Sequence, residues 1–507
     1  MNHIILPYGP SSRKVGSCSS FSLCYSSRIS LRMYSISCPM KETVLEFLCS
    51  SGWEVERMTD HEMAREIALR VRAEGGTAYY VGGYVRDRLL GRDNKDIDIE
   101  VHGITPDALA GILSSLGEMT TFGESFGIFG LRHCHLDIAM PRSEQAVGAG
   151  HRDFLCTLDP FIGTRQAAIR RDFTVNALMQ DILTGQVVDH FGGLADLDAH
   201  VLRHMDDRRF AEDPLRVLRG AQFAARFGFR IAPETVKICS RMDLSFLPPE
   251  RIFGELEKAL MKASQPSVFF RELRQMGQLS FWFPELEKLI DVPQPPQYHP
   301  EGDVWTHTLL VLDQAAALRD QAADPLGLML AALCHDLGKP AVTRVEADGR
   351  LHAFGHDSAG VPIADTFLSR ILGEKKRRTY VKNMVELHML PNMLVAQRAG
   401  EKSFCRMFDR AVSPEDLLLL AKADVLGSCV PPQQYAATEV ELREHLAVFR
   451  ARMAVPYVTG ADLIAAGFQP GNAFHEALDY AHRLQLSGVD RKSTLSQTLV
   501  FLRSREG

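Results

Sequence analysis

Apolar residues follow two different periods along this chain. In short segments between about residues 78 and 189 they alternate with polar residues, which is the period of β strands. In most other segments they recur every three to four positions, as on one face of an α-helix. The alternating pattern predicts strands at 78–81, 96–101, 127–131, 136–140 and 187–189. The helical pattern predicts helices at 42–49, 61–73, 106–116, 173–180, 215–227, 249–262 and 267–276, then a helical unit at about 305–427.

These elements divide the chain into a mixed α+β head and an all-helical body. The predicted parts are a leader at 1–45, a head at 46–195, a helical neck at 196–291, a second helical unit at 292–430 and a helical tail at 431–507. The boundary at 292 rests on Val292-Pro293-Gln294-Pro295-Pro296, because three prolines in four residues cannot continue a helix.

The first forty residues differ in composition from the rest. They are rich in serine, carry lysine and arginine, and contain no acidic residue before Glu42. Such a segment cannot build a core, and its composition is typical of a mitochondrial or plastid transit peptide. The alternatives are a disordered extension, or translation from a later start at Met33 or Met40.

The overall composition narrows the class of protein. Hydrophobic residues make up 46% and charged residues 24% of the 507 residues, which excludes a disordered or collagen-like chain. The formal net charge is -6, so any contact with nucleic acid has to be local. The 10 cysteines form no Cys-x-x-Cys pair, which argues against a disulfide or zinc-finger framework. No run of about 18 apolar residues exists, so we expect no membrane span.

A strand that ends in two glycines opens the first candidate site. In Tyr80-Val81-Gly82-Gly83-Tyr84-Val85-Arg86-Asp87, glycine lets the backbone approach an anionic ligand, and the amides that begin the next helix face that ligand. Arg86 lies in the first turn of this helix, where its guanidinium can reach a phosphate. A tight turn without a ligand would give the same pattern.

Two aspartates on the next predicted strand strengthen the interpretation. Residues i and i+2 of a strand share one face, so Asp96 and Asp98 point to one side while Ile97 and Ile99 enter the core. Two adjacent carboxylates repel each other unless a cation lies between them. A hard divalent ion such as Mg²⁺, carrying a nucleoside triphosphate, suits this arrangement. Asp137, on another predicted strand, is either a third ligand or a solvated residue.

The order of these motifs resembles the class II tRNA nucleotidyltransferases, the CCA-adding enzymes and bacterial poly(A) polymerases of the polymerase-beta superfamily. The resemblance spans about residues 79–279 and continues through the segments 170–177, 189–193 and 212–219. It implies a polymerase-beta-like head with a helical neck, and template-independent transfer of CMP and AMP from CTP and ATP to a tRNA 3′ end. It also implies two Mg²⁺ ions on Asp96 and Asp98, with Gly83 and Arg86 at the nucleotide.

A second group of residues suggests how the base is chosen. Asp213, Arg216 and Arg219 follow at intervals of three, which on a helix places them on one face. Cytosine and adenine have an exocyclic amine beside an unprotonated ring nitrogen, so a carboxylate and a guanidinium fit them and repel uracil and guanine. The resemblance assigns this role to Asp213 and Arg216, with Arg219 and Arg171 near the triphosphate. Alone, Glu212-Asp213-Pro214 is also a common helix start.

Histidines and aspartates recur in the second helical unit. A contiguous His335-Asp336 pair follows an apolar segment, with His307 upstream and Asp424 downstream. This order resembles the HD-domain metal-dependent phosphohydrolases and implies that these four residues bind a metal. Mixed imidazole and carboxylate ligands favour Mn²⁺, Ni²⁺ or Fe over Ca²⁺. The alternative is a domain with only a structural role.

The same resemblance extends to a second metal and to the arrangement of domains. His356 and His388 are placed to complete a second metal site, as in dinuclear HD domains. Fusion of an HD domain behind a nucleotidyltransferase resembles the bacterial multifunctional members of the CCA-adding family. We therefore expect a cytoplasmic protein, with a mitochondrion or plastid as the alternative if the leader is a transit peptide.

Other interpretations share these motifs. A poly(A) polymerase or A-adding enzyme of the same family has every motif of the head, and a head that only binds tRNA would leave the HD domain as the active part. The implied partners are the tRNA 3′ end, CTP and ATP, with no membrane; the oligomeric state is open. The segment 141–168 corresponds to a flexible loop that the family needs for adding the final A, and is otherwise a surface loop. The basic run 375–378 is either a solvated face or a contact for tRNA phosphates.

Overall fold

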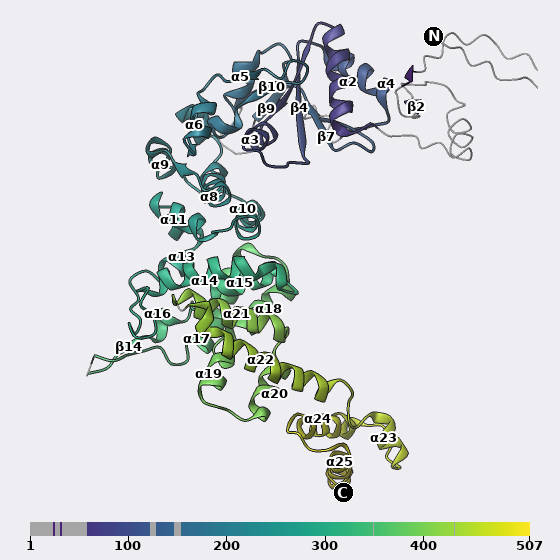
Figure 1. Cartoon of the computed structure of the whole chain (residues 1–507), viewed down its shortest axis with the longest axis vertical. Coiled ribbons are helices and arrows are strands. Elements are labelled where there is room, and N and C mark those ends of the chain that lie inside the picture. Colours follow the sequence, from purple (N-terminus) through teal and green to yellow (C-terminus); the bar gives the residue numbers. More distant parts are fainter. Residues whose placement is uncertain are drawn as a thin grey trace, which may run out of the picture. The chain divides into compact units, whose positions relative to one another are not determined.

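The computed structural model describes residues 58–121, 128–146, 154–347, 349–429 and 431–506, with two short strands at Cys24–Tyr25 (β1) and Leu31–Arg32 (β2). Apart from these two strands, the predicted leader and the predicted helix at 42–49 lie outside the described residues. The chain divides into two compact units, residues 1–168 with 176–190, and residues 169–175 with 191–507 (Figure 1).

A seven-stranded mixed sheet forms the centre of the first unit. The strand order is β11-β10-β3-β4-β7-β6-β5, in which β4 and β7 are parallel and the other pairs are antiparallel. The strands are β3 (Thr77–Val81), β4 (Ile97–His102), β5 (Met119–Thr121), β6 (Ile128–Leu131), β7 (Leu136–Ala139), β10 (Met179–Asp181) and β11 (Val187–Val188). The five predicted strands are confirmed, with ends that differ by one or two residues.

Helices cover the apolar face of this sheet. Ile97, Ile99 and Val101 of β4 are buried, and α2 (Asp60–Ala73) packs against β3, β4 and α4 (Pro106–Leu116). Thr59 and Glu62 form a capping box at the start of α2, so the first helical amides have acceptors. Both helices agree with the sequence prediction to within one residue.

The prediction of a helix at 173–180 is wrong. This segment forms a 3₁₀ turn at Thr174–Asn176 (η2) and then strand β10, which pairs with β3 and β11. Residues 172–179 are all buried, so the segment has no polar face by which a helix would be distinguished from a buried strand. Pairing with the sheet decides the conformation.

The segment 141–168 contains more regular structure than a loop. Strands β8 (Arg142–Ala146) and β9 (Phe154–Leu158) form an antiparallel pair, and α5 (Thr164–Ala168) follows. Residues 147–153, between the two strands, lie outside the described part of the chain.

The second unit is almost entirely helical. In the neck, α8 (Leu215–Phe227), α10 (Pro249–Lys262) and α11 (Ser267–Gln275) match the predicted helices to within one residue. The neck also contains α6 (Gly193–Asp198), β12 (Val201–Leu202), α7 (Asp207–Ala211), β13 (Arg230–Ile231), α9 (Pro233–Cys239), α12 (Leu279–Trp282) and α13 (Pro284–Glu287).

The helical unit after the neck begins at α14. Its elements are α14 (Val304–Leu318), η3 (Arg319–Gln321), α15 (Pro325–Cys334), α16 (Lys339–Val342), β14 (Arg344–Val345), β15 (Leu351–His352), α17 (His356–Ile371), α18 (Lys375–Leu387), α19 (Leu390–Ala396), α20 (Glu401–Arg410) and α21 (Pro414–Gly427). The neck shares a core with this unit, because Phe283 contacts both Phe270 and Phe367 of α17 edge to face, and Ser267 donates a hydrogen bond to Asp313 of α14.

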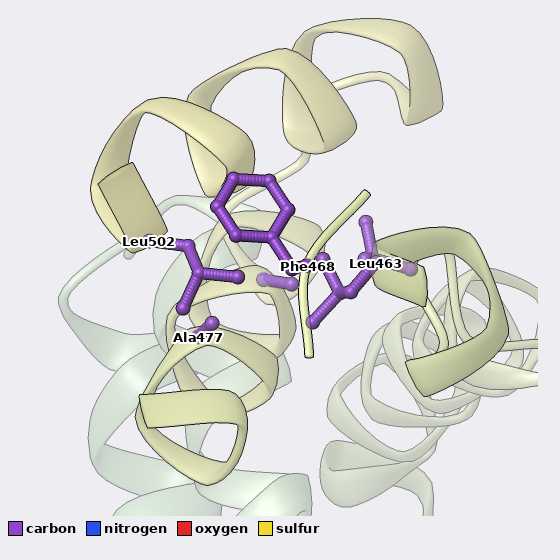
Figure 2. Packing of buried hydrophobic residues seen from close by; sticks show 6 residues of the cluster. Leu463, Phe468, Ala477 and Leu502 are labelled. Atoms are coloured by element: carbon purple, nitrogen blue, oxygen red, sulfur yellow. The ribbon is translucent and has the colours of Figure 1, made fainter. Parts of the chain in front are cut away.

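The tail has a small hydrophobic core of its own. The tail consists of α22 (Pro432–Met453), α23 (Gly460–Ala465), α24 (Asn472–Leu486) and α25 (Arg491–Glu506). Figure 2 shows the side chains of Leu463, Phe468, Ala477 and Leu502 converging between the last three of these helices. Among the described residues, no helix has the length and apolar character needed to cross a bilayer.

Candidate active sites

Three carboxylates share one face of the sheet in the head. Asp98 of β4 is the register partner of Asp137 on the parallel strand β7, and register partners on adjacent strands point to the same side. Asp96 lies two residues before Asp98, directly ahead of β4, so in an extended backbone it projects to that side as well. Asp96 and Asp137 are exposed and Asp98 is half-buried, opposite the buried Ile97 and Ile99. The two predicted ligands and the possible third thus come from neighbouring strands.

The donor set in the head fits Mg²⁺ by its chemistry, since all three groups are carboxylate oxygens. In the described part of the chain, the groups of three or more potential ligands within 4.8 Å of one another all lie in the second unit. The three carboxylates of the head are therefore brought to one face but not into one tight group.

The glycine turn before β4 has a conformation that requires glycine. Gly82 has φ of +68°, in the left-handed region that other residues rarely adopt, and it precedes α3 (Gly83–Leu89). Arg86 of α3 is only 3% exposed. Its guanidinium donates to Asp87 at 2.9 and 2.7 Å and also to the side chain of Asn176. Arg86 thus joins α3 to Asn176 within the first unit, and nucleotide binding by Gly83 and Arg86 stays a prediction.

Asp213 precedes helix α8 instead of lying on it. Its Oδ1 accepts a hydrogen bond from the backbone of Leu215 at 3.1 Å, Pro214 is the N-cap of α8, and Oδ2 pairs with Arg251 at 3.3 Å. The expectation of one helical face carrying Asp213, Arg216 and Arg219 is therefore wrong for Asp213. The carboxylate faces the start of α8, because its Oδ1 accepts from the amide of the first helical residue, Leu215.

Arg216 and Arg219 of α8 are both bonded to the segment 170–172. Arg216 donates to the carbonyl of Arg170 at 2.6 Å, and Arg219 donates to Asp172 at 2.8 and 2.6 Å. Burial lowers the pKa of Arg219, but the charge of Asp172 outweighs burial, so the pKa of the guanidinium is raised. Arg171 is half-buried in the same segment. Arg216 and Arg219 are thus held by hydrogen bonds to the segment that contains Arg171. Their roles at the base and the triphosphate stay predictions.

Four histidines and two aspartates gather between the helices of the unit 304–427. His307 and His335 lie 3.4 Å apart between their Nε2 atoms, and His356 and His388 lie 3.2 Å apart. Asp336 belongs to both groups, with Oδ2 3.2 Å from His335 Nε2 and Oδ1 3.4 Å from His356 Nε2. Two sets of ligand atoms therefore share one carboxylate.

Asp424 completes the first of these two sets. Its Oδ1 lies 3.0 Å from His307 Nε2 and 3.8 Å from His335 Nε2. All six residues predicted for the HD site are thus brought together.

Hydrogen bonds to the backbone fix the tautomer of three of these histidines. The Nδ1 atoms of His335, His356 and His388 each donate to the carbonyl three residues earlier, at 2.8, 2.8 and 2.7 Å. A carbonyl can only accept, so in the neutral ring Nε2 carries the lone pair. Unprotonated Nε2 atoms that face one another at 3.2 Å are the arrangement expected of metal ligands.

Asp336 also lacks hydrogen bonds although it is buried. Neither of its oxygens accepts one from a described residue, although Lys339 Nζ lies 2.7 Å from Oδ2. The charges of His335 and Lys339 outweigh burial and hold the pKa of Asp336 well below its usual range. A buried, ionised carboxylate among imidazole nitrogens fits a transition metal better than a hard oxygen-loving ion.

The pKa values of the other ligands differ because their partners differ. Burial lowers the pKa of His307, but hydrogen bonds to Asp424 and Glu301 outweigh burial and raise the pKa to about 9. Burial, with His335 and His356 nearby, lowers the pKa of His388 to about 4. A cation bound beside His307 therefore has to displace a proton.

A glycine in the sequence His335-Asp336-Leu337-Gly338 brings the two sets of ligands together. A Cβ atom at Gly338 would lie 2.0 Å from the carbonyl oxygen of His356. Only glycine allows the start of α17 to approach this closely.

Sequence reasoning missed four residues of this site. Glu301 is buried and accepts from Nδ1 of His307 at 2.8 Å and of His299 at 2.9 Å. Lys339 lies one helical turn after Asp336, so its spacing could have indicated it. Glu301, His299 and Gln294 lie in a segment without helix or strand, where no periodicity indicates which side chains turn inward.

A cavity of about 720 Å³ opens onto these ligands. Its lining includes Asp336, Asp424, His356 and Lys339 at the polar end, and Tyr298, Leu351, Phe354 and Met389 elsewhere. We call it the HD cavity. It has room for a substrate of nucleotide size.

The basic run 375–378 is engaged within the protein. Arg377 pairs with Asp324 at 3.0 Å, and Arg378 lies 3.8 Å from Asp365. These contacts favour a solvated helix face over an RNA contact for the two arginines.

Comparison with known proteins matches three family models in the order of the sequence. The Poly A polymerase head domain matches residues 78–203, the probable RNA and SrmB-binding site of polymerase A matches 228–290, and the HD domain matches 304–427. Solved CCA-adding enzymes have the same fold. The Bacillus stearothermophilus enzyme in complex with CTP is 20% identical with a TM-score of 0.60, covering 89% of this chain and 99% of that one. The Thermotoga maritima enzyme complexed with tRNA is 19% identical with a TM-score of 0.56, covering 87% and 95%.

Curated relatives are more similar in sequence. The multifunctional CCA protein of Actinobacillus pleuropneumoniae serotype 5b (strain L20) is 42% identical over 317 residues, which are 61% of this chain and 74% of the relative. That of Pasteurella multocida (strain Pm70) is 37% identical over 405 residues, 77% of this chain and 92% of the relative. Identity of this extent over nine-tenths of the Pasteurella multocida relative shows that the chain belongs to the family of multifunctional CCA proteins.

Proposed function

We propose that this protein adds CCA to the 3′ end of tRNA from CTP and ATP without a nucleic-acid template. The observation that supports the proposal best is the set of carboxylates on β4 and β7, with Asp98 and Asp137 in register, in a chain of this family. Mg²⁺ bound there would lower the pKa of the 3′-hydroxyl and neutralise the leaving pyrophosphate. Asp96 and Asp98 are its proposed ligands, with Asp137 as a third.

The neck residues are proposed to select the base. The free lone pairs of the Asp213 carboxylate accept from the exocyclic amine of cytosine or adenine, and Arg216 donates to the ring nitrogen. Hydrogen bonds to Leu215 and to the carbonyl of Arg170 hold these two groups in place. Arg171 and Arg219 are proposed to neutralise the triphosphate.

The test is incorporation into tRNA that lacks its CCA end, by the full-length protein with Mg²⁺. We expect CMP addition from CTP alone and completion of CCA from CTP and ATP together. Long adenylate tails from ATP alone would instead indicate a poly(A) polymerase. No incorporation with any nucleotide would indicate a head that only binds tRNA.

The catalytic carboxylates are tested by Asp98→Asn, with Asp93→Asn as the matched control, because Asp93 is exposed in the preceding loop. Loss of a charged metal ligand is expected to reduce incorporation by more than about a hundredfold. The control should retain the wild-type rate. Equal rates for the Asp98 variant and the wild type would refute the metal assignment.

We also propose that the HD domain is an active metal-dependent phosphohydrolase. The supporting observation is the sharing of Asp336 by two sets of buried ligand atoms. Mn²⁺, Ni²⁺ or Fe is proposed as the metal. His335→Ala with Asp336→Ala is expected to remove phosphate-ester hydrolysis measured with each metal, and to leave CMP addition within about twofold. Equal loss of both activities would contradict separate active sites.

The proposed compartment is the cytoplasm, because the curated relatives reported above come from bacteria, which have no mitochondria or plastids. A fusion of residues 1–45 to a fluorescent reporter tests the alternative of organellar import. Accumulation of the reporter in mitochondria or plastids would overturn this proposal.

A further inference from the structure

The proline-rich segment 292–296 places the side chain of Gln294 in the wall of the HD cavity. Gln294 is 5% exposed, whereas Pro293 and Gln297 on either side are exposed. Gln294 lines the cavity together with Asp336. This segment is therefore part of the HD site.

The backbone around Gln294 is stiff. Pro293 has a fixed φ, and Pro295 restricts the preceding residue, Gln294, to extended conformations. The carbonyl of Val292 accepts a hydrogen bond from Val304 at the start of α14, at 3.0 Å. Gln294 is thus presented with little conformational freedom.

A hydrogen bond from Lys339 sets the orientation of the Gln294 amide. Lys339 Nζ donates to Oε1 at 2.6 Å. Lysine has no acceptor, so the oxygen faces Lys339 and Nε2 faces away from it. Nε2 is buried and has no acceptor among the residues that the structure describes. A buried donor without an acceptor costs free energy, which indicates that a ligand supplies the acceptor.

The surroundings indicate what that ligand is. An amide with two N–H donors and a lysine ammonium form a pair suited to an oxyanion, and neither can coordinate a cation while so oriented. The same Lys339 Nζ lies 2.7 Å from Asp336 Oδ2. One ammonium therefore bridges Gln294 Oε1 and Asp336 Oδ2, and both residues line the HD cavity.

We propose that Gln294 Nε2 donates a hydrogen bond to a non-bridging oxygen of the phosphate bound in the HD cavity, with Lys339 holding the amide. Gln294 is then a substrate-binding residue of the phosphohydrolase. The inference rests on the HD activity proposed above.

The test is calorimetric binding of inorganic phosphate to the full-length, Mn²⁺-loaded protein. Gln294→Glu keeps the length and the acceptor for Lys339 but removes the donors, and Gln294→Met removes the donors without adding charge. Both are expected to bind phosphate about tenfold or more weakly, the value of a hydrogen bond to a charged group. Gln297→Glu, the exposed control in the same segment, is expected to stay within twofold.

Two further measurements separate binding from damage to the site. Mn²⁺ affinity and CMP incorporation are expected to be unchanged in both Gln294 variants. Wild-type phosphate affinity in the Gln294 variants would overturn the inference and indicate a bound water at Nε2. If the wild type itself neither binds phosphate nor hydrolyses phosphate esters with Mn²⁺, Ni²⁺ or Fe, the proposed HD activity fails and the inference fails with it.

Discussion

Individual side chains in this protein differ in how far the sequence alone identifies them. The aspartates of the head lie on a strand whose alternation is readable, and the structure places Asp98 beside Asp137. The six HD residues lie in or directly beside helices, and they are brought together as the resemblance implied. Glu301 and Gln294 lie in an irregular segment, so their approach to the site depends on tertiary packing that no local pattern encodes.

At the scale of single residues, the proposed base selection can be tested at the carboxylate of Asp213. Asp213→Ala removes the acceptor for the exocyclic amine and leaves the arginine donors, so we expect selectivity for C and A over U and G to fall by roughly 1–3 kcal/mol. The measurement is kcat/KM for all four nucleotides on tRNA lacking its CCA end.

The control for this prediction is Asp207→Ala. Asp207 is an exposed acid in the same part of the neck, and its carboxylate lies 2.7 Å from His204 Nε2. Unchanged discrimination in the Asp213 variant, with activity retained, would exclude the carboxylate as the base reader.

Helices and strands could be predicted from the sequence where only one of their faces is buried. The helices α4 and α10 have one buried face, and their bounds agree with the prediction. The segment 173–180 is buried as far as residue 179 and forms a 3₁₀ turn and the start of β10 in place of the predicted helix. The two-residue strands β12 to β15 are too short to leave a period in the sequence.

One buried acid joins three elements of the HD unit. Asp416 of α21 accepts from the backbone of Ala323 and Asp324, before α15, and from the hydroxyl of Tyr380 on α18 at 2.7 Å. Burial, with the nearby charge of Asp416, raises the pKa of Tyr380, so the hydroxyl remains a donor at all physiological pH values.

Tyr380→Phe is therefore expected to reduce the free energy of unfolding by about 1.5–3 kcal/mol, the value of a hydrogen bond to a charged group. Tyr298→Phe is the control, because Tyr298 is 68% exposed. Thermal denaturation of both variants checks the prediction. Equal midpoints would mean that the two backbone amides satisfy Asp416 without Tyr380.

In the whole molecule, the two proposed active sites lie in separate parts of the sequence, but the hydrophobic core does not divide between the neck and the HD unit. The proposed transferase residues of the neck and the HD ligands belong to different parts of the sequence, yet Phe283 packs on both α11 and α17. Arg370 of α17 also donates to the carbonyl of Trp282 at 2.8 Å. Neck and HD unit therefore share a core even though their proposed reactions are independent.

Phe283→Ala is expected to destabilise this shared core by about 3–5 kcal/mol, because it leaves a cavity among aromatic rings. Neck and HD unit should then unfold in one transition at a lower temperature, with CMP addition and phosphate-ester hydrolysis lost together on heating. Phe281→Ala is the control, since Phe281 is 47% exposed. Loss of hydrolysis at a temperature where CMP addition persists would show that the two parts unfold separately.

The main-chain acceptors of His335, His356 and His388 also affect how the HD site can change by mutation. A carbonyl three residues earlier is supplied by any amino acid, so substitutions at Ala332, Ala353 or Val385 leave the tautomer of the ring unaltered. His307 differs, because its Nδ1 depends on the side chain of Glu301. The side chains at these three positions therefore do not set the tautomer, whereas a single substitution at Glu301 can disorient a ligand without replacing it.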